Sequence, residues 1–199
     1  MSRVRGGPVL ARWLLPPLAL LLAACTATEI PPPSPAEDAA SPFTDCGALN
    51  APPAPADGLA AGLPDLSLPC FSGGAPVRLA ALRGPAVINL WGSWCDPCRE
   101  ELPVMQELAD ATAGRLRVVG VNTMDSRDAG ASFAADKGVT FPTLFDPGKT
   151  LLTALGKINL PVTVFVGADG GRFVYTGKAL DKPTLGGLVR AHTGVTVTG

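Results

Sequence analysis

Residues 91–98 read WGSWCDPC, in which two residues separate Cys95 from Cys98. They follow residues 85–90, a short aliphatic run typical of a buried parallel strand. Apolar residues then recur at helical spacing, i, i+4 and i+7, from Cys98 until Gly114. The sequence therefore predicts a buried strand, a short loop that contains the cysteine pair, and a helix that begins near Cys95.

The two cysteines straddle the first turn of the predicted helix. A separation of three residues there brings their β-carbons to roughly 5–6 Å, so small rotamer changes can close a disulfide. Cys95 lies at the positive end of the helix dipole, which stabilises a nucleophilic thiolate. Cys98 lies one turn further in. This arrangement predicts a redox-active pair in which Cys95 attacks a substrate disulfide and Cys98 resolves the mixed disulfide.

Two stretches carry a resemblance to a known family: residues 89–103, NLWGSWCDPCREELP, and residues 160–163, LPVT. They resemble the thioredoxin superfamily, in particular its TlpA/ResA/DsbE-like branch of membrane-anchored thiol-disulfide oxidoreductases. Asn89 stands where ordinary thioredoxins have a buried aspartate, which brings the chain closer to the ResA-like branch. The resemblance covers roughly residues 63–192. It implies an α/β, thioredoxin-like fold with a central mixed sheet flanked by helices and an N-terminal β-hairpin extension.

The resemblance also implies an activity, namely disulfide exchange with exported proteins and no dissociable cofactor. Many members of the resembled branch are reductants, including those that act on apocytochromes during cytochrome c maturation. Relatives in some bacteria are oxidants, so the direction stays open. The implied partners are the thiols and disulfides of exported proteins, together with an upstream electron donor or acceptor in the membrane.

Three further positions are expected to contact substrate or the cysteine pair. In thioredoxin-like proteins the proline that aligns with Pro161 is cis and faces the two cysteines. The residue before it, here Leu160, offers its backbone to an extended substrate by strand addition. Trp94, next to Cys95, is expected to bind substrate as well.

Helical phase separates two neighbouring glutamates. At about 3.6 residues per turn, Glu101 falls beside Cys98 on the inward stripe, whereas Glu100 points to the opposite face. A carboxylate on a core-facing stripe requires a reason. In the resembled branch an acid at this position lies near the pair, where it can raise thiol pKa values and accept the proton that Cys98 loses. The alternative is a partly exposed Glu101 that supports the first helical turn through its dipole.

The remaining pattern alternates strands and helices, which predicts βαβ units with parallel strands. Alternation around Gly73 and Gly74 predicts a short β-hairpin over residues 63–78. The expected elements that follow are strands 86–90, 117–122 and 143–146, helices 96–113, 127–137 and 147–155, an antiparallel hairpin of 162–166 with 172–176, and a last helix over 181–191.

The amino terminus has the features of an export signal. Three arginines precede an apolar block, residues 13–24, which is shorter than the ~20 residues that span a bilayer. Residues 22–25, LAAC, resemble a bacterial lipobox, so residues 1–24 are expected to be a signal peptide and Cys25 the lipidated first residue. The alternative is an ordinary signal peptide that leaves Cys25 as a free thiol. Either form is exported, and the lipidated form lies at the extracytoplasmic face of the cell membrane.

Composition separates a linker from a folded domain. Residues 25–61 are rich in proline and alanine, which predicts an extended linker, and residues 62–199 are expected to form the domain. Hydrophobic residues make up 47% of the chain and charged residues 17%, which supports a packed core. Loss of residues 1–24 removes three of 16 basic residues and none of 17 acidic ones, so the net charge becomes −4. No basic stripe remains for nucleic acid.

Cys46 and Cys70 are the remaining cysteines. Exported proteins favour paired cysteines, so we expect them to form a structural disulfide. A zinc site shared with the redox pair is disfavoured, because these two cysteines are 24 residues apart instead of in a second knuckle. No metal site is therefore expected. A cysteine–histidine nucleophilic pair would need His192, the only histidine, which is expected on a helix surface.

Two other functional classes match the sequence less well. A thiol peroxidase would have a threonine three residues before its reactive cysteine, where this chain has Gly92. A copper-delivery lipoprotein on the same fold would have three residues between its cysteines and a distant histidine, whereas here two residues separate them. Metal delivery nevertheless stays open as the alternative from a different class.

Overall fold

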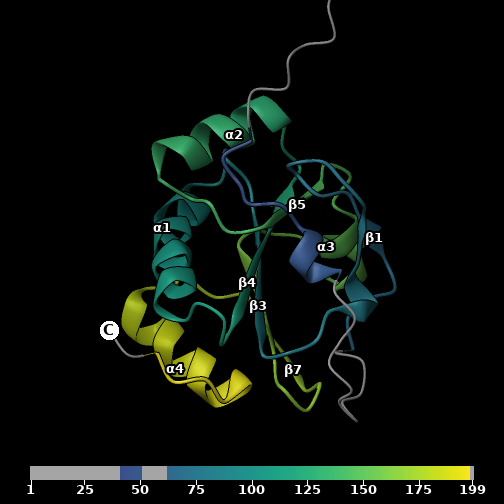
Figure 1. Ribbon diagram of the computed structural model, residues 1–199. Coiled ribbons are helices and arrows are strands. Elements are labelled where there is room, and N and C mark those ends of the chain that lie inside the picture. The colour runs from purple at the N-terminus through teal and green to yellow at the C-terminus, as the bar shows by residue number, and fades with distance from the viewer. Residues whose placement is uncertain (1–40, 51–61, 198–199) are drawn as a thin grey trace, which may run out of the picture. The chain divides into compact units, whose positions relative to one another are not determined.

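The computed structural model describes residues 41–50 and 62–197, and its centre is a five-stranded sheet in the order β5-β4-β3-β6-β7 (Figure 1). The strands β3 (Ala86–Trp91), β4 (Arg117–Thr123) and β5 (Thr143–Asp146) run parallel. The strands β6 (Val162–Val166) and β7 (Arg172–Tyr175) join the other edge in antiparallel pairs. The predicted mixed sheet and its βαβ order are confirmed.

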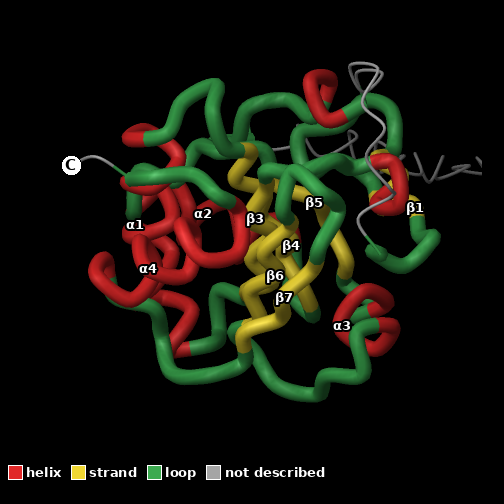
Figure 2. Tube along the Cα trace, turned by 90° about the horizontal axis from the view of Figure 1, so that it is seen from below, coloured by secondary structure: helices red, strands yellow, loops and turns green. Residues whose placement is uncertain are grey.

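Helices cover one face of this sheet, namely α1 (Asp96–Ala111), α2 (Arg127–Asp136) and α4 (Lys182–Thr193). Figure 2 shows them on one side of the strands, with the small helix α3 (Thr150–Ala154) and the strand β1 (Ser67–Leu68) on the other. The sheet is therefore covered on both faces, as its aliphatic strands require.

Alternation along β3 explains the two layers. Val87 and Trp91 pack into the apolar cluster under the helices, whereas Ile88 and Leu90 pack into the cluster on the α3 side. Successive side chains of a strand point to opposite faces. Asn89 shares the helical face with Val87 and Trp91, so this buried polar residue is directed toward α1.

The β1 strand pairs antiparallel with β2 (Val77–Arg78), which confirms the predicted N-terminal hairpin. Two short 3-10 helices, η1 (Gly47–Leu49) and η2 (Leu79–Ala81), belong to the same side of the molecule. The α3 helix begins at Thr150 and not at 147. The reason is the Asp146 carboxylate, which accepts the Thr150 N–H at 2.8 Å and the Leu151 N–H at 2.9 Å.

Residues 41–50 lie within the range expected to be a linker, but the structure packs them against the domain. Phe43 is buried against Phe71, with ring centroids 4.8 Å apart, and it also approaches Trp91. The Thr44 N–H donates to the Thr140 carbonyl at 2.8 Å. The folded part therefore extends upstream of residue 62, because Phe43 supplies an apolar anchor that the surrounding prolines obscure.

The expected signal peptide, Cys25 and the rest of the expected linker lie outside the described residues. Within residues 41–50 and 62–197, no helix has the length and apolar character needed to cross a membrane.

Candidate active site

Cys95 and Cys98 form a disulfide at the amino-terminal end of α1, with an S–S distance of 2.07 Å and Cα atoms 5.3 Å apart. Cys95 is the N-cap residue of the helix, and its sulfur accepts the Cys98 N–H at 3.4 Å. Cys95 retains 5% of its surface exposed to solvent and Cys98 none. Of the two cysteines, only Cys95 therefore retains contact with solvent, and Cys98 is completely enclosed.

Pro161 lies directly before β6, and the Leu160–Pro161 peptide bond is cis. Its neighbour Val162 pairs with Leu90 near the end of β3, so Pro161 and the loop over 91–98 lie at the same edge of the sheet. The peptide bond before Pro85 is also cis, which the sequence reasoning did not foresee.

Leu160 is partly buried and packs against both apolar clusters. No backbone hydrogen bond from another described residue reaches its N–H or carbonyl group. A pocket of about 400 Å³ opens beside it, lined in part by Ile158, Pro161 and Thr176. Ile158 is 88% exposed, so apolar surface and free backbone groups occur together next to Pro161.

The two tryptophans of this region have different environments. Trp91 is completely buried and packs against Phe43 and Phe133. Trp94 is 54% exposed, yet its indole N–H donates to the Met124 carbonyl at 2.8 Å. Trp94 therefore presents an apolar surface beside Cys95 in a fixed orientation.

Glu101 is completely buried on α1, one turn beyond Cys98, whereas Glu100 is exposed. The Asn89 side chain donates to Glu101 Oε1 at 2.5 Å, and the Leu180 N–H donates to Oε2 at 3.0 Å. Burial raises the pKa of the Glu101 carboxyl above its ordinary value, and these two hydrogen bonds offset only part of that rise. Glu101 is thus a buried carboxyl group one turn from Cys98, and its raised pKa means that its carboxylate binds a proton more readily than that of an ordinary surface glutamate.

Asn89 connects Glu101 to the sheet. Its side-chain amide also donates to Thr163 Oγ1 at 3.1 Å, while its own Oδ1 meets no hydrogen-bond partner among the described residues. The sequence identified Asn89 only as a departure from thioredoxin. It gave no sign of the Leu180 contact, because that residue is 79 positions from Glu101 and acts through its backbone.

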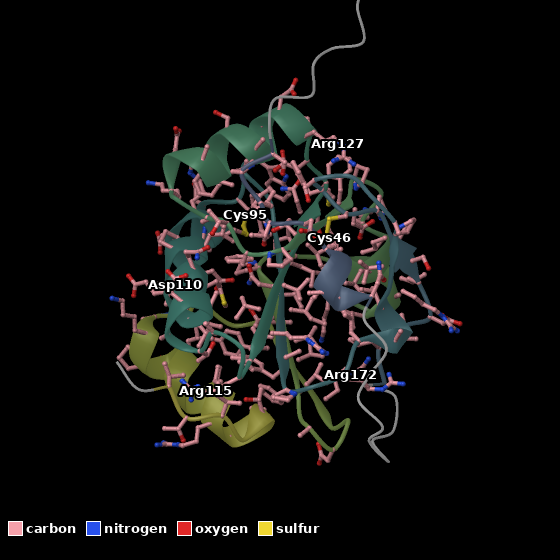
Figure 3. The ribbon with its side chains drawn as sticks, viewed as in Figure 1. Cys46, Cys95, Asp110, Arg115, Arg127 and Arg172 are labelled. Atoms are coloured by element: carbon pink, nitrogen blue, oxygen red, sulfur yellow. A yellow bond between two sulfur atoms is a disulfide. The ribbon has the colours of Figure 1, made fainter. Side chains whose placement is uncertain are left out.

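Cys46 and Cys70 form the second disulfide, with an S–S distance of 1.99 Å and Cα atoms 5.9 Å apart. They pack in the apolar cluster on the α3 side, whereas Cys95 and Cys98 belong to the cluster under the helices. Figure 3 shows Cys95 beside α1 and Cys46 near β5. The structure thus separates the two pairs, and within the described ranges no three histidine, cysteine or acidic side chains gather as a metal site would require.

His192 lies far from the redox pair. Its ring stacks on Phe173 with centroids 3.8 Å apart and also approaches Phe165. Phe165 pairs with Val87 near the start of β3, whereas Cys95 follows the end of that strand. This placement offers no cysteine–histidine pair.

Residues 60–171, more than half of the chain, match the AhpC/TSA family. The protein belongs to the AhpC/TSA family. This membership and the relatives below confirm the resemblance to ResA-like and DsbE-like proteins.

The chain is 32% identical over 99 residues to the thiol-disulfide oxidoreductase ResA of Bacillus subtilis, and the aligned stretch covers 49% of this chain and 55% of ResA. It is 37% identical over 93 residues to the thiol:disulfide interchange protein CycY of Rhizobium leguminosarum, covering 46% and 49%. The chain thus spans about half the length of the curated relatives it matches.

Solved structures confirm the thioredoxin-like fold of this AhpC/TSA family member. MTB dsbF, in its mixed oxidized and reduced forms, superposes with a TM-score of 0.60 at 27% identity, covering 65% of this chain and 98% of dsbF. A secreted Mycobacterium tuberculosis disulfide oxidoreductase homologous to E. coli DsbE gives 0.58 at 28% identity, covering 64% and 96%.

Proposed function

We propose that the protein is an extracytoplasmic thiol-disulfide oxidoreductase that exchanges disulfides with exported proteins through Cys95 and Cys98. The observation that carries this proposal is the Cys95–Cys98 disulfide at the start of α1, in which Cys95 retains 5% of its surface exposed and Cys98 none. ResA and CycY are named as thiol-disulfide exchange proteins, which supports the same reaction here.

The chemistry follows from that asymmetry. In the reduced protein, the Cys95 thiolate attacks one sulfur of a substrate disulfide and forms a mixed disulfide, while the other substrate sulfur leaves as a thiolate. Cys98, once deprotonated, attacks the Cys95 sulfur and releases the second substrate thiolate. The substrate gains two electrons and the Cys95–Cys98 disulfide forms. The opposite direction uses the same steps in reverse.

Glu101 is proposed to accept the proton that Cys98 must lose. Its carboxyl is buried one turn from Cys98, and its raised pKa brings it closer to that of a thiol. Asn89 and the Leu180 N–H hold the carboxyl in place through both oxygens. This arrangement gives Cys98 a proton acceptor one turn away on the same helix.

Substrate is proposed to bind as an extended segment beside Pro161. The backbone groups of Leu160, which no described residue engages, can pair with the backbone of such a segment. Exposed Trp94, next to Cys95 in the sequence, offers apolar contact to residues that flank the substrate cysteine. We further propose that lipid on Cys25 holds the protein at the outer face of the membrane, where an electron donor or acceptor in the membrane restores the pair.

The direction of exchange is set by the redox potential. The resemblance favours a reductant, with apocytochrome thiols in cytochrome c maturation as the proposed target, and the alternative is an oxidant of exported proteins. Equilibration of the full chain with glutathione buffers, read by mass spectrometry after alkylation, measures the potential of Cys95 and Cys98. A potential well below −200 mV, near that of thioredoxin, supports the reductant, and one near that of DsbA supports the oxidant. Failure of the pair to exchange with any disulfide contradicts the proposed function.

A further inference from the structure

Asp125 lies in the short connection between β4 and α2, at the same edge of the sheet as Cys95. Its carboxylate accepts four hydrogen bonds. Two come from Ser93, from its N–H at 2.7 Å and its hydroxyl at 2.9 Å. The others come from the Asn122 side chain at 2.8 Å and the Ser126 N–H at 2.9 Å. An ionised carboxylate has about four acceptor positions, so its capacity is filled.

Ser93, two residues before Cys95, is thereby fixed at every polar group. Its carbonyl, the one group that Asp125 cannot bind, accepts from Arg99 Nη1 at 2.9 Å. The Arg99 guanidinium in turn lies over the Phe133 ring, 4.4 Å from its centroid. Ser93 is therefore held by Asp125 from the β4–α2 connection and by Arg99 from α1.

A second set of contacts joins the same two loops. Met124, in the left-handed backbone region at φ 54°, accepts the Trp94 indole N–H through its carbonyl. Gly92 lies where a β-carbon would approach the Trp94 ring nitrogen to 2.7 Å and the Thr123 carbonyl to 3.1 Å. These contacts are possible because Trp91 and Asn122 are paired residues at the ends of β3 and β4.

We propose that Asp125 is a positioning residue for the redox site, which acts through Ser93 to fix Cys95 and Trp94 relative to an incoming polypeptide. This inference rests on the proposed function. Hydrogen bonds to a charged acceptor are shorter and stronger than neutral ones, and two of them converge on one residue of a loop that contains glycine. Disulfide exchange needs the attacking sulfur aligned with the bond it breaks, and a misplacement of about 1 Å can cost on the order of 100-fold in rate.

The first test compares Asp125→Asn with Asp128→Asn in the full chain. Asparagine keeps the size of Asp125 but replaces one acceptor oxygen with a donor, so it cannot accept both the Ser93 N–H and the Ser126 N–H, which bind different oxygens of Asp125. Asp128 is an exposed acid in the first turn of α2 and serves as the matched control. Reduction of a disulfide-bonded peptide is measured as kcat and KM, and reaction with the small disulfide DTNB is measured alongside.

We expect Asp125→Asn to lower kcat for the peptide by 10-fold or more and to change the DTNB rate by less than threefold. Asp128→Asn should keep both rates within twofold of the wild type. The pKa of the Cys95 thiol, measured from the pH dependence of alkylation, should be the same in all three proteins. Wild-type peptide kinetics in Asp125→Asn would overturn the proposal. A rate loss fully explained by a shifted Cys95 pKa would also overturn it, because Asp125 would then act through its charge.

A double-mutant cycle with Ser93→Ala tests the route of the effect and supplies a second variant if Asp125→Asn fails to fold. Ser93→Ala removes the hydroxyl but keeps the N–H bond, so we expect a smaller loss, about threefold in kcat. Because both residues act through one contact, the loss from Ser93→Ala should disappear in the Asp125→Asn background. Additive losses, or a wild-type rate in Ser93→Ala, would overturn the proposal. A wild-type protein that exchanges with no disulfide would instead contradict the proposed function, before any variant is compared.

Discussion

Glu101 is the residue whose environment departs most from that of an ordinary surface acid. Burial raises the pKa of the Glu101 carboxyl in the folded protein, whereas in the unfolded chain this pKa is about 4.3. There is therefore a pH range in which the folded protein holds the carboxyl proton and the unfolded chain has lost it. The free energy of unfolding should therefore fall as pH rises through that range, by at most about 1.4 kcal/mol per pH unit. Glu101→Gln should remove this slope and Glu100→Gln should retain it, as measured by chemical denaturation between pH 4 and 9. Equal slopes in the two variants would show that Glu101 is not the group responsible.

The same residue provides a kinetic prediction. If Glu101 accepts the Cys98 proton, Glu101→Gln should slow the resolution of a mixed disulfide on the order of 100-fold, the typical contribution of a general base. Rapid mixing of the reduced protein with a disulfide-bonded peptide, followed by an acid quench, measures the lifetime of the adduct. Glu100→Gln is the matched control, because it is exposed on the same helix. An unchanged lifetime in Glu101→Gln would assign the proton to water.

At the scale of single residues, sequence predicted what helical phase and local spacing determine. Cys95 and Cys98 lie at the start of α1 and Glu101 is buried, because those positions depend on one helix alone. Asp125 was not predicted, since 32 residues separate it from Ser93. Only the pairing of β3 with β4 brings the two together.

Among the elements, the segment over 41–50 depends most on a single covalent link. The Cys46–Cys70 disulfide closes a loop with a sequence separation of 24, and it joins η1 to the residues that follow β1. In the chain-entropy model a loop of this size contributes about 3 kcal/mol. The double variant Cys46→Ala, Cys70→Ala should therefore lose about 3 kcal/mol of unfolding free energy in urea denaturation. It should keep the redox potential of Cys95 and Cys98, which lie in the other apolar cluster. A stability within 0.5 kcal/mol of the wild type would refute a structural role for this disulfide.

Element prediction succeeded where the hydrophobic period was clear. The five strands of the central sheet, the four helices and the hairpin of β1 with β2 all occur near their expected ranges. The segment over 41–50 was assigned to the linker, because the prolines and small residues around it carry no hydrophobic period. Its anchors, Phe43 on Trp91 and Thr44 on Thr140, are long-range contacts that local pattern does not reveal.

For the whole molecule, the order of strands and helices predicted βαβ units with parallel strands. The thioredoxin-like fold itself was predicted from the family resemblance of residues 89–103 and 160–163. The proposed attachment to the membrane depends instead on Cys25, which lies outside the described residues. If lipid on Cys25 is the anchor, Cys25→Ala should move the exported protein from the washed membrane fraction to the soluble fraction. Two or more acyl chains are needed for stable retention. Retention of Cys25→Ala in the washed membranes would place the anchor elsewhere.

The central claim is that Cys95 at the N-cap of α1 attacks substrate and that the completely buried Cys98 completes the exchange. It is tested most directly by trapping the reduced Cys98→Ser and Cys95→Ser variants with a disulfide-bonded peptide, followed by mass spectrometry without reduction. The N-cap position of Cys95 and the complete burial of Cys98 predict that Cys98→Ser accumulates a covalent adduct through Cys95 and that Cys95→Ser forms none. An adduct through Cys98, or equal trapping by the two variants, would contradict the account.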